Sequence, residues 1–75
     1  MNLEFELLLR DYDSSSKPSP NDSKTRRVLD KVAVNIYNGL YSLQDFYDFI
    51  DSNMGNGYFA NKCKEHVTNL LKQAE

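Results

Sequence analysis

Apolar residues recur with the period of an α-helix between positions 28 and 40, and this pattern constrains the fold more than any other feature. At about 100° per residue they cover roughly half of the helix circumference, which is more than one supporting contact needs. The pattern therefore predicts a central helix on which other helices pack. Its apolar residues are Val28, Leu29, Val32, Ala33, Ile36, Tyr37 and Leu40.

Signals for a helix start and a helix end flank this pattern. Ser19 suits an N-cap, Pro20 suits the first helical position, and Asp22 has the spacing of a capping box. Gly39 suits the left-handed residue that often follows a helix. The central helix is therefore predicted from Pro20 to Asn38. Its outer half carries the apolar Val34 among the polar residues Lys24, Arg27, Lys31, Asn35 and Asn38.

A second helix is predicted directly after Gly39. Ser42 and Asp45 have the spacing of a capping box, and Gly55 can end the helix. Because the connection is so short, these two helices must form a hairpin. One side of the second helix is apolar, with Leu43, Phe46, Tyr47, Phe49, Ile50 and Met54, and the other is polar, with Gln44, Asp45, Asp48, Asp51 and Ser52.

Asn56 and Gly57 precede a last helical segment with a narrower apolar stripe of about 120°, which is typical of a helix that lies on a surface. Lys62, Lys64, Glu65 and Lys72 are expected to face water. The stripe consists of Phe59, Cys63, Val67, Leu70, Leu71 and Ala74.

The first segment fits two kinds of secondary structure. As a helix it places Leu3 and Leu7 opposite its apolar face, and as a strand it alternates apolar and charged residues. A lone strand in a helical chain has no backbone partner unless a second copy supplies one, so helix is favoured and strand is the alternative. The helical face would consist of Phe5, Leu8, Leu9 and Tyr12.

Together these segments predict an all-α fold, a compact bundle of three or four helices in one domain that spans residues 1–75. Residues 14–20 are rich in Ser and Pro, and we expect them to form an exposed loop that is too short to separate two domains. A chain of this size buries only about 60% of its unfolded surface, so tight helix packing, a second copy or a partner is an expected source of stability.

Composition bears on the cellular location and on the class of partner. Cys63 is the single cysteine and no secretory signal is visible, which favours a reducing cytoplasm. The longest apolar run, Leu7 to Leu9, is too short to cross a membrane. The net charge of −2 gives no overall attraction to nucleic acid.

Charge alternates along the chain. Residues 1–16 carry −3, residues 17–31 carry +3, and residues 32–53 carry −3. We expect oppositely charged helices to lie side by side. The alternative is a basic patch around Arg26 and Arg27.

Cys63 and His66 have the spacing to meet on one helix face. A metal site needs three or four ligands, and the sequence has no second cysteine or histidine to add. Cys63 is therefore predicted to be a core residue with His66 beside it, and no metal, cofactor, small-molecule substrate or catalytic residue is expected. No Gly-rich phosphate loop or nucleophile elbow occurs.

Asp45, Asp48 and Asp51 form an acidic ridge opposite the apolar side of their helix. We expect a solvated face, and the alternative is a docking site for a basic partner. With Arg26 and Arg27, they are the candidate charged docking residues.

The favoured function is a non-enzymatic protein–protein interaction module, such as a small regulator, inhibitor or immunity-type protein. The expected partner is another protein or a second copy in a homodimer. The candidate partner surface consists of apolar residues that a small bundle cannot easily hide, namely Leu3, Leu7, Val34 and Tyr37.

The alternative is a helix-turn-helix transcriptional regulator, because the last two predicted helices are joined by a short Gly-containing turn. Nucleic-acid binding is disfavoured by the acidic ridge and by the negative net charge. The residues that would contact DNA are Asn56, Tyr58, Asn61, Lys62 and Lys64.

Overall fold

The computed structural model describes residues 3–14 and 23–74, and all regular secondary structure in these ranges is helical. The helices are α1 (Leu3–Ser14), α2 (Ser23–Tyr37), α3 (Leu43–Asn53) and α4 (Tyr58–Ala74). The predicted all-α bundle is therefore confirmed. The first segment is a helix, so the strand alternative is wrong.

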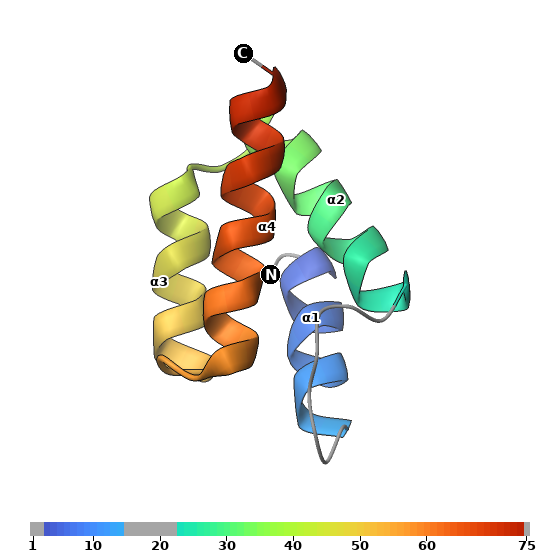
Figure 1. The fold of residues 1–75 in the computed structure, drawn as a ribbon, viewed down its shortest axis with the longest axis vertical. Helices are drawn as coiled ribbons and strands as arrows, with labels where there is room; N and C mark the ends of the chain where they lie inside the picture. Colours follow the sequence, from blue (N-terminus) through green and yellow to red (C-terminus); the bar gives the residue numbers. More distant parts are fainter. Residues whose placement is uncertain (1–2, 15–22, 75) are drawn as a thin grey trace.

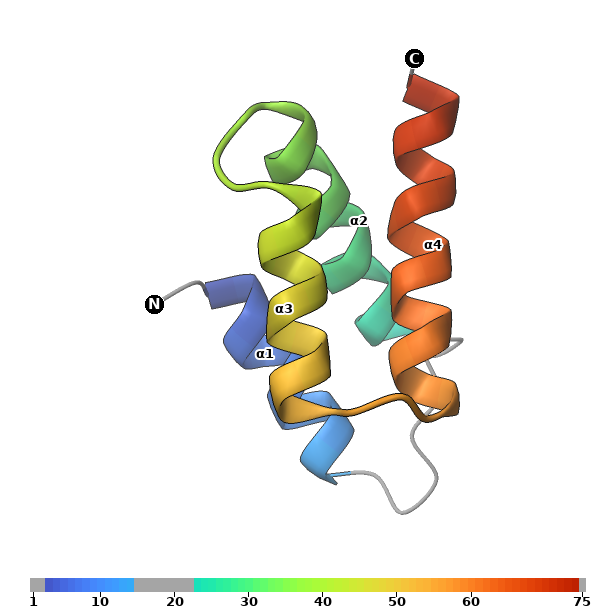
Figure 2. The ribbon, with the colours of Figure 1, turned by 90° about the vertical axis from the view of Figure 1, so that its left-hand side faces the viewer.

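Successive helices run in opposite directions (Figures 1 and 2). α2 packs against both α1 and α4, and α3 packs against α4. The acidic α1 thus lies beside the basic start of α2, where the Thr25 hydroxyl donates a hydrogen bond to an Asp11 carboxylate oxygen over 3.3 Å. This agrees with the expectation that oppositely charged helices lie side by side.

All four helices contribute to one core. The apolar faces that helical spacing predicts are largely the faces that the structure buries. Burying one such side chain stabilises the fold by about 1.5–3 kcal/mol, so this core is the main source of stability. The largest fully buried side chains are Leu8 from α1, Leu29 and Val32 from α2, Phe46 and Ile50 from α3, and Cys63 and Val67 from α4.

Aromatic contacts hold α1 against the other helices. The Phe5 ring stacks on Phe49 with 4.6 Å between centroids and meets Tyr41 edge-on at 5.0 Å. The centroid of the Tyr12 ring lies 5.1 Å from that of the Phe59 ring on α4. Such ring pairs contribute about 0.5–1.5 kcal/mol each beyond their buried area, and they use the helix face that the sequence predicts.

α2 ends in the left-handed conformation expected at Gly39, where φ is +83°. The Gly39 amide donates to the Ile36 carbonyl and the Leu40 amide donates to the Asn35 carbonyl, each over 3.0 Å. This is the Schellman arrangement, which provides donors for carbonyls that the helix end leaves unpaired.

The predicted capping box of α3 is present. The Asp45 amide donates to the Ser42 hydroxyl over 3.0 Å, and the Ser42 amide donates to the Asp45 carboxylate over 3.1 Å. Gly55, with φ of +71°, follows the helix as expected.

Several boundaries differ from the sequence-based expectation. α1 continues to Ser14, the first residue of the predicted exposed loop. The rest of that loop lies outside the described residues, as do Ser19, Pro20 and Asp22, the predicted start of the central helix.

Two residue placements on the central helix were wrong. Asn35, expected on the polar face, is buried, and its side-chain amide donates to the Tyr41 hydroxyl over 3.3 Å. Leu40, expected in the apolar face, is 69% exposed because it lies beyond the turn at Gly39. The hydrogen bond from the Asn35 amide to Tyr41 offsets the cost of burying this polar side chain.

Substitutions at Gly39 test this helix end. Gly39→Val should lower the free energy of unfolding by about 1–2 kcal/mol, because a β-branched residue resists a positive φ. No neighbouring atom would contact the new Cβ, so the loss reflects the backbone alone. Gly39→Asn should lose less, because Asn tolerates this conformation. If urea denaturation gave the same loss of unfolding free energy for both variants, the left-handed conformation assigned to Gly39 would be contradicted.

Candidate protein-docking site

An apolar groove of about 310 Å³ lies between α2 and the C-terminal half of α4. Side chains from both helices form its walls, and most of them are apolar. A concave apolar surface of this size can bury part of a partner, so the groove is the candidate site. It is lined by Asp30, Ala33, Val34 and Tyr37 of α2 and by Leu70, Leu71 and Ala74 of α4.

The groove forms because apolar residues of α2 continue beyond the core that the helix covers, with Tyr37 at the edge of the apolar arc and Val34 outside it. Val32 and Ala33 are buried, whereas Val34 is 49% and Tyr37 64% exposed. On α4 the fully buried residues end at Val67. Leu70, Leu71 and Ala74 therefore face α2 without fully burying the apolar side chains of either helix.

A polar contact joins the two walls of the groove. Nε2 of His66 on α4 lies 2.8 Å from Oδ1 of Asp30 on α2, and both side chains are partly exposed. Because Asp30 also lines the groove, this contact joins α2 to α4 beside it. The two residues are 36 positions apart, so no local sequence signal connects them.

Basic residues continue the groove face of α2 toward its N-terminus. Arg27 and Lys31 precede Val34 by seven and three positions, which places them on the same helix face. Both are exposed, as is Arg26. The predicted basic residues therefore lie on the helix that forms one wall of the groove.

The predicted partner surface is divided. Val34 and Tyr37 lie together in the groove. Leu3 is 63% exposed and Leu7 is half-buried on α1, but neither lines the groove. Helical spacing predicted that these four residues would lie outside the core. It did not predict that Leu3 and Leu7 would lie away from Val34 and Tyr37, because that depends on how α1 packs.

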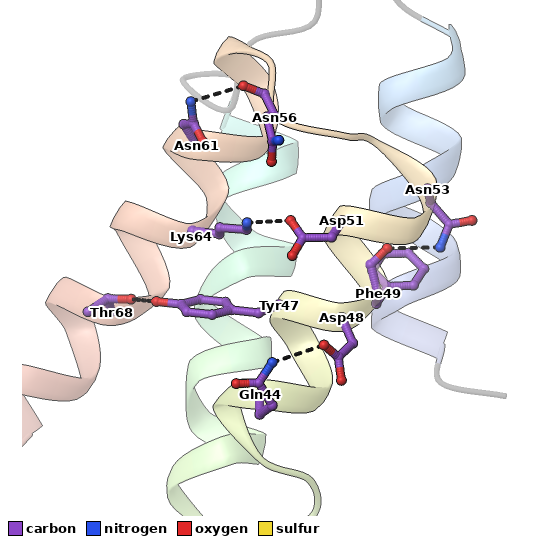
Figure 3. A network of polar contacts seen from close by, with 10 residues as sticks. All are labelled: Gln44, Tyr47, Asp48, Phe49, Asp51, Asn53, Asn56, Asn61, Lys64 and Thr68. Atoms are coloured by element: carbon purple, nitrogen blue, oxygen red, sulfur yellow. Dashed lines mark hydrogen bonds and ion pairs between the residues drawn. The ribbon is translucent and has the colours of Figure 1, made fainter.

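The acidic ridge is exposed on α3, and each of its carboxylates has a partner within the chain. Figure 3 shows the partners of Asp48 and Asp51. Asp45 belongs to the capping box, Asp48 accepts a hydrogen bond from the Gln44 amide over 2.9 Å, and Asp51 accepts one from the Lys64 ammonium. These contacts compete with an external basic partner at all three positions.

The α3–α4 pair is also linked through neutral groups (Figure 3). The hydroxyls of Tyr47 and Thr68 lie 2.7 Å apart, and the Asn61 amide donates to the Asn56 carbonyl over 3.2 Å. Lys62 lies 3.8 Å from Glu65 and above the Tyr58 ring. Of the five residues expected to contact DNA, Asn61, Lys62 and Lys64 therefore use their side chains in polar contacts within the chain.

Cys63 and His66 occupy different environments despite their spacing. Cys63 is fully buried, and this burial raises the pKa of its thiol to about 12. A thiol in this state is a poor metal ligand and a poor nucleophile. Across residues 3–14 and 23–74, no group of three His, Cys, Asp or Glu side chains is arranged to hold a metal ion.

None of the helices in the described part of the chain combines the length and the apolar character needed to cross a bilayer. Comparison with known protein families, curated proteins and solved structures found no match to this chain. The candidate site therefore rests on geometry and chemistry alone.

The environment of Cys63 predicts low reactivity toward thiol reagents. Its pKa is raised from 9.0 to about 12, so at mildly alkaline pH the folded chain contains about a thousandfold less thiolate than an exposed cysteine. The reaction with a disulfide reagent should be at least about a hundredfold slower in the native chain than in guanidinium chloride. Similar rates in the two states would show that Cys63 is accessible.

Proposed function

We propose that this chain is a non-enzymatic protein–protein interaction module that acts in the cytoplasm as a small regulator, inhibitor or immunity-type protein. Its partner is another protein or a second copy of the chain. The main support is the groove between α2 and α4, where the exposed Val34 and Tyr37 lie together with apolar residues of α4. Exposed apolar surface that borders a groove is typical of a docking site.

The size of the groove bears on the strength of the complex. Burying a valine or leucine side chain contributes about 1.5–3 kcal/mol, and association itself costs about 4–15 kcal/mol. A handful of apolar side chains therefore supports a modest affinity. Residues around the groove must contribute the remaining binding free energy.

The side chains best suited to catalysis are poorly placed for it, which supports a non-enzymatic role. Cys63 is buried as a neutral thiol, and His66 contacts Asp30 at a partly exposed position. A nucleophile needs a base within hydrogen-bond reach and access to substrate. Cys63 has no access to solvent.

The DNA-binding alternative has less support. Lys64, one of its expected DNA contacts, pairs with Asp51 of the neighbouring helix and lies 5.3 Å above the Tyr47 ring. Asp48 and Asp51 would repel phosphate groups at the same place. A protein partner is therefore the better proposal.

The proposal can be tested with two variants that add the same charge at exposed apolar positions. Val34→Asp should abolish capture of the partner from the native host, because it introduces a charge into the groove. Leu3→Asp, on α1 outside the groove, should leave capture unchanged. Circular dichroism should show that both variants keep their helices.

Sedimentation equilibrium of the wild-type chain and of both variants separates the two kinds of partner. A dimer that Val34→Asp dissociates would identify a second copy in the groove. Equal capture by the two variants, together with an unchanged mass, would contradict a docking role for the groove.

A further inference from the structure

We infer that the groove between α2 and α4 binds an amphipathic helix of a partner protein, and that the residues flanking the apolar face of this helix are acidic. The inference rests on the proposed docking function and adds the shape and charge of the occupant.

The walls of the groove suit a helix. Asp30, Val34 and Tyr37 recur along α2 at spacings of four and three residues, so the α2 wall is about two helical turns long, or roughly 10 Å. Leu70, Leu71 and Ala74 form the opposite wall. A partner helix with apolar residues at positions i, i+3 or i+4, and i+7 would place them between these two rows, as adjacent helices do in a bundle.

The charges along the groove indicate the sign of the partner. Arg27 and Lys31 are exposed on the face of α2 that carries Val34. The carboxylate that lines the groove, Asp30, already contacts His66. Apart from Asp30 in this pair, the exposed charges on this face of α2 are those of Arg27 and Lys31, and both are positive.

Acidic residues beside the apolar face of the partner would meet Arg27 and Lys31, whereas basic residues would be repelled. Exposed charge pairs add modest affinity, and their effect is strongest on association rate and selectivity at low salt. The apolar contacts thus provide most of the binding, and Arg27 and Lys31 discriminate between partners.

Two synthetic helical peptides can test this inference. Both carry the same leucine face, and they differ only in flanking Glu or Lys residues. In NMR titrations at low salt, the Glu peptide should shift amide signals around Val34, Tyr37 and Leu71. Its affinity should exceed that of the Lys peptide by at least about tenfold, and the preference should shrink as salt is added.

Charge reversal on the protein provides the matched control. Lys31→Glu and Lys72→Glu change the net charge equally at exposed helical positions. Neither residue lines the groove, but Lys31 lies one turn before Val34 on the same face of α2, whereas Lys72 is two positions from Leu70 and from Ala74 and so lies on the far side of α4. Lys31→Glu should weaken binding of the Glu peptide about tenfold or more, and Lys72→Glu should have little effect.

The outcomes separate this inference from the function on which it rests. If both peptides shift the groove signals with equal affinity, or if the two variants behave alike, the groove is a docking site but the acidic preference is wrong. If neither peptide shifts the groove signals, the occupant is not a helix of this kind. If, in addition, Val34→Asp and Leu3→Asp capture the partner equally, the docking function also fails.

Discussion

Burial of Leu29 and Val32 on α2 is the interaction on which the rest of this bundle depends. α2 packs against both α1 and α4, and these two side chains are fully buried. Each contributes about 1.5–3 kcal/mol, which is a large share of the roughly 5–15 kcal/mol that stabilises a domain. The chain contains a single cysteine and therefore no internal disulfide, so apolar packing carries most of its stability.

The same helix creates the candidate site. Tyr37 at the edge of its apolar arc and Val34 outside the arc remain exposed, while Val32 and Ala33 are buried. The contact between His66 and Asp30 joins α4 to α2 beside this surface, and the groove lies between the two helices. Fold and proposed function thus depend on the two sides of one helix.

Local sequence signals predicted the helices well, because helix ends and amphipathic faces depend on residues close in the chain. Gly39 and the Ser42–Asp45 capping box have the expected conformations. Contacts between distant residues were not predictable in this way. Asn35 was assigned to solvent by polarity alone, although its amide bonds to Tyr41, and nothing in the sequence pairs Asp30 with His66. The groove itself depends on such tertiary contacts, so the sequence indicated its apolar residues but not their arrangement.

The central claim is that α2 has one face that the fold requires and another that it leaves open for a partner. The free energies of unfolding of Val32→Ala and Val34→Ala test it directly, because both changes remove the same atoms from the same helix. Val32→Ala should lose about 2 kcal/mol or more, whereas Val34→Ala should stay within about 0.5 kcal/mol of the wild-type chain. Equal losses at the two positions would contradict the account, because they would mean that the fold needs both faces of α2.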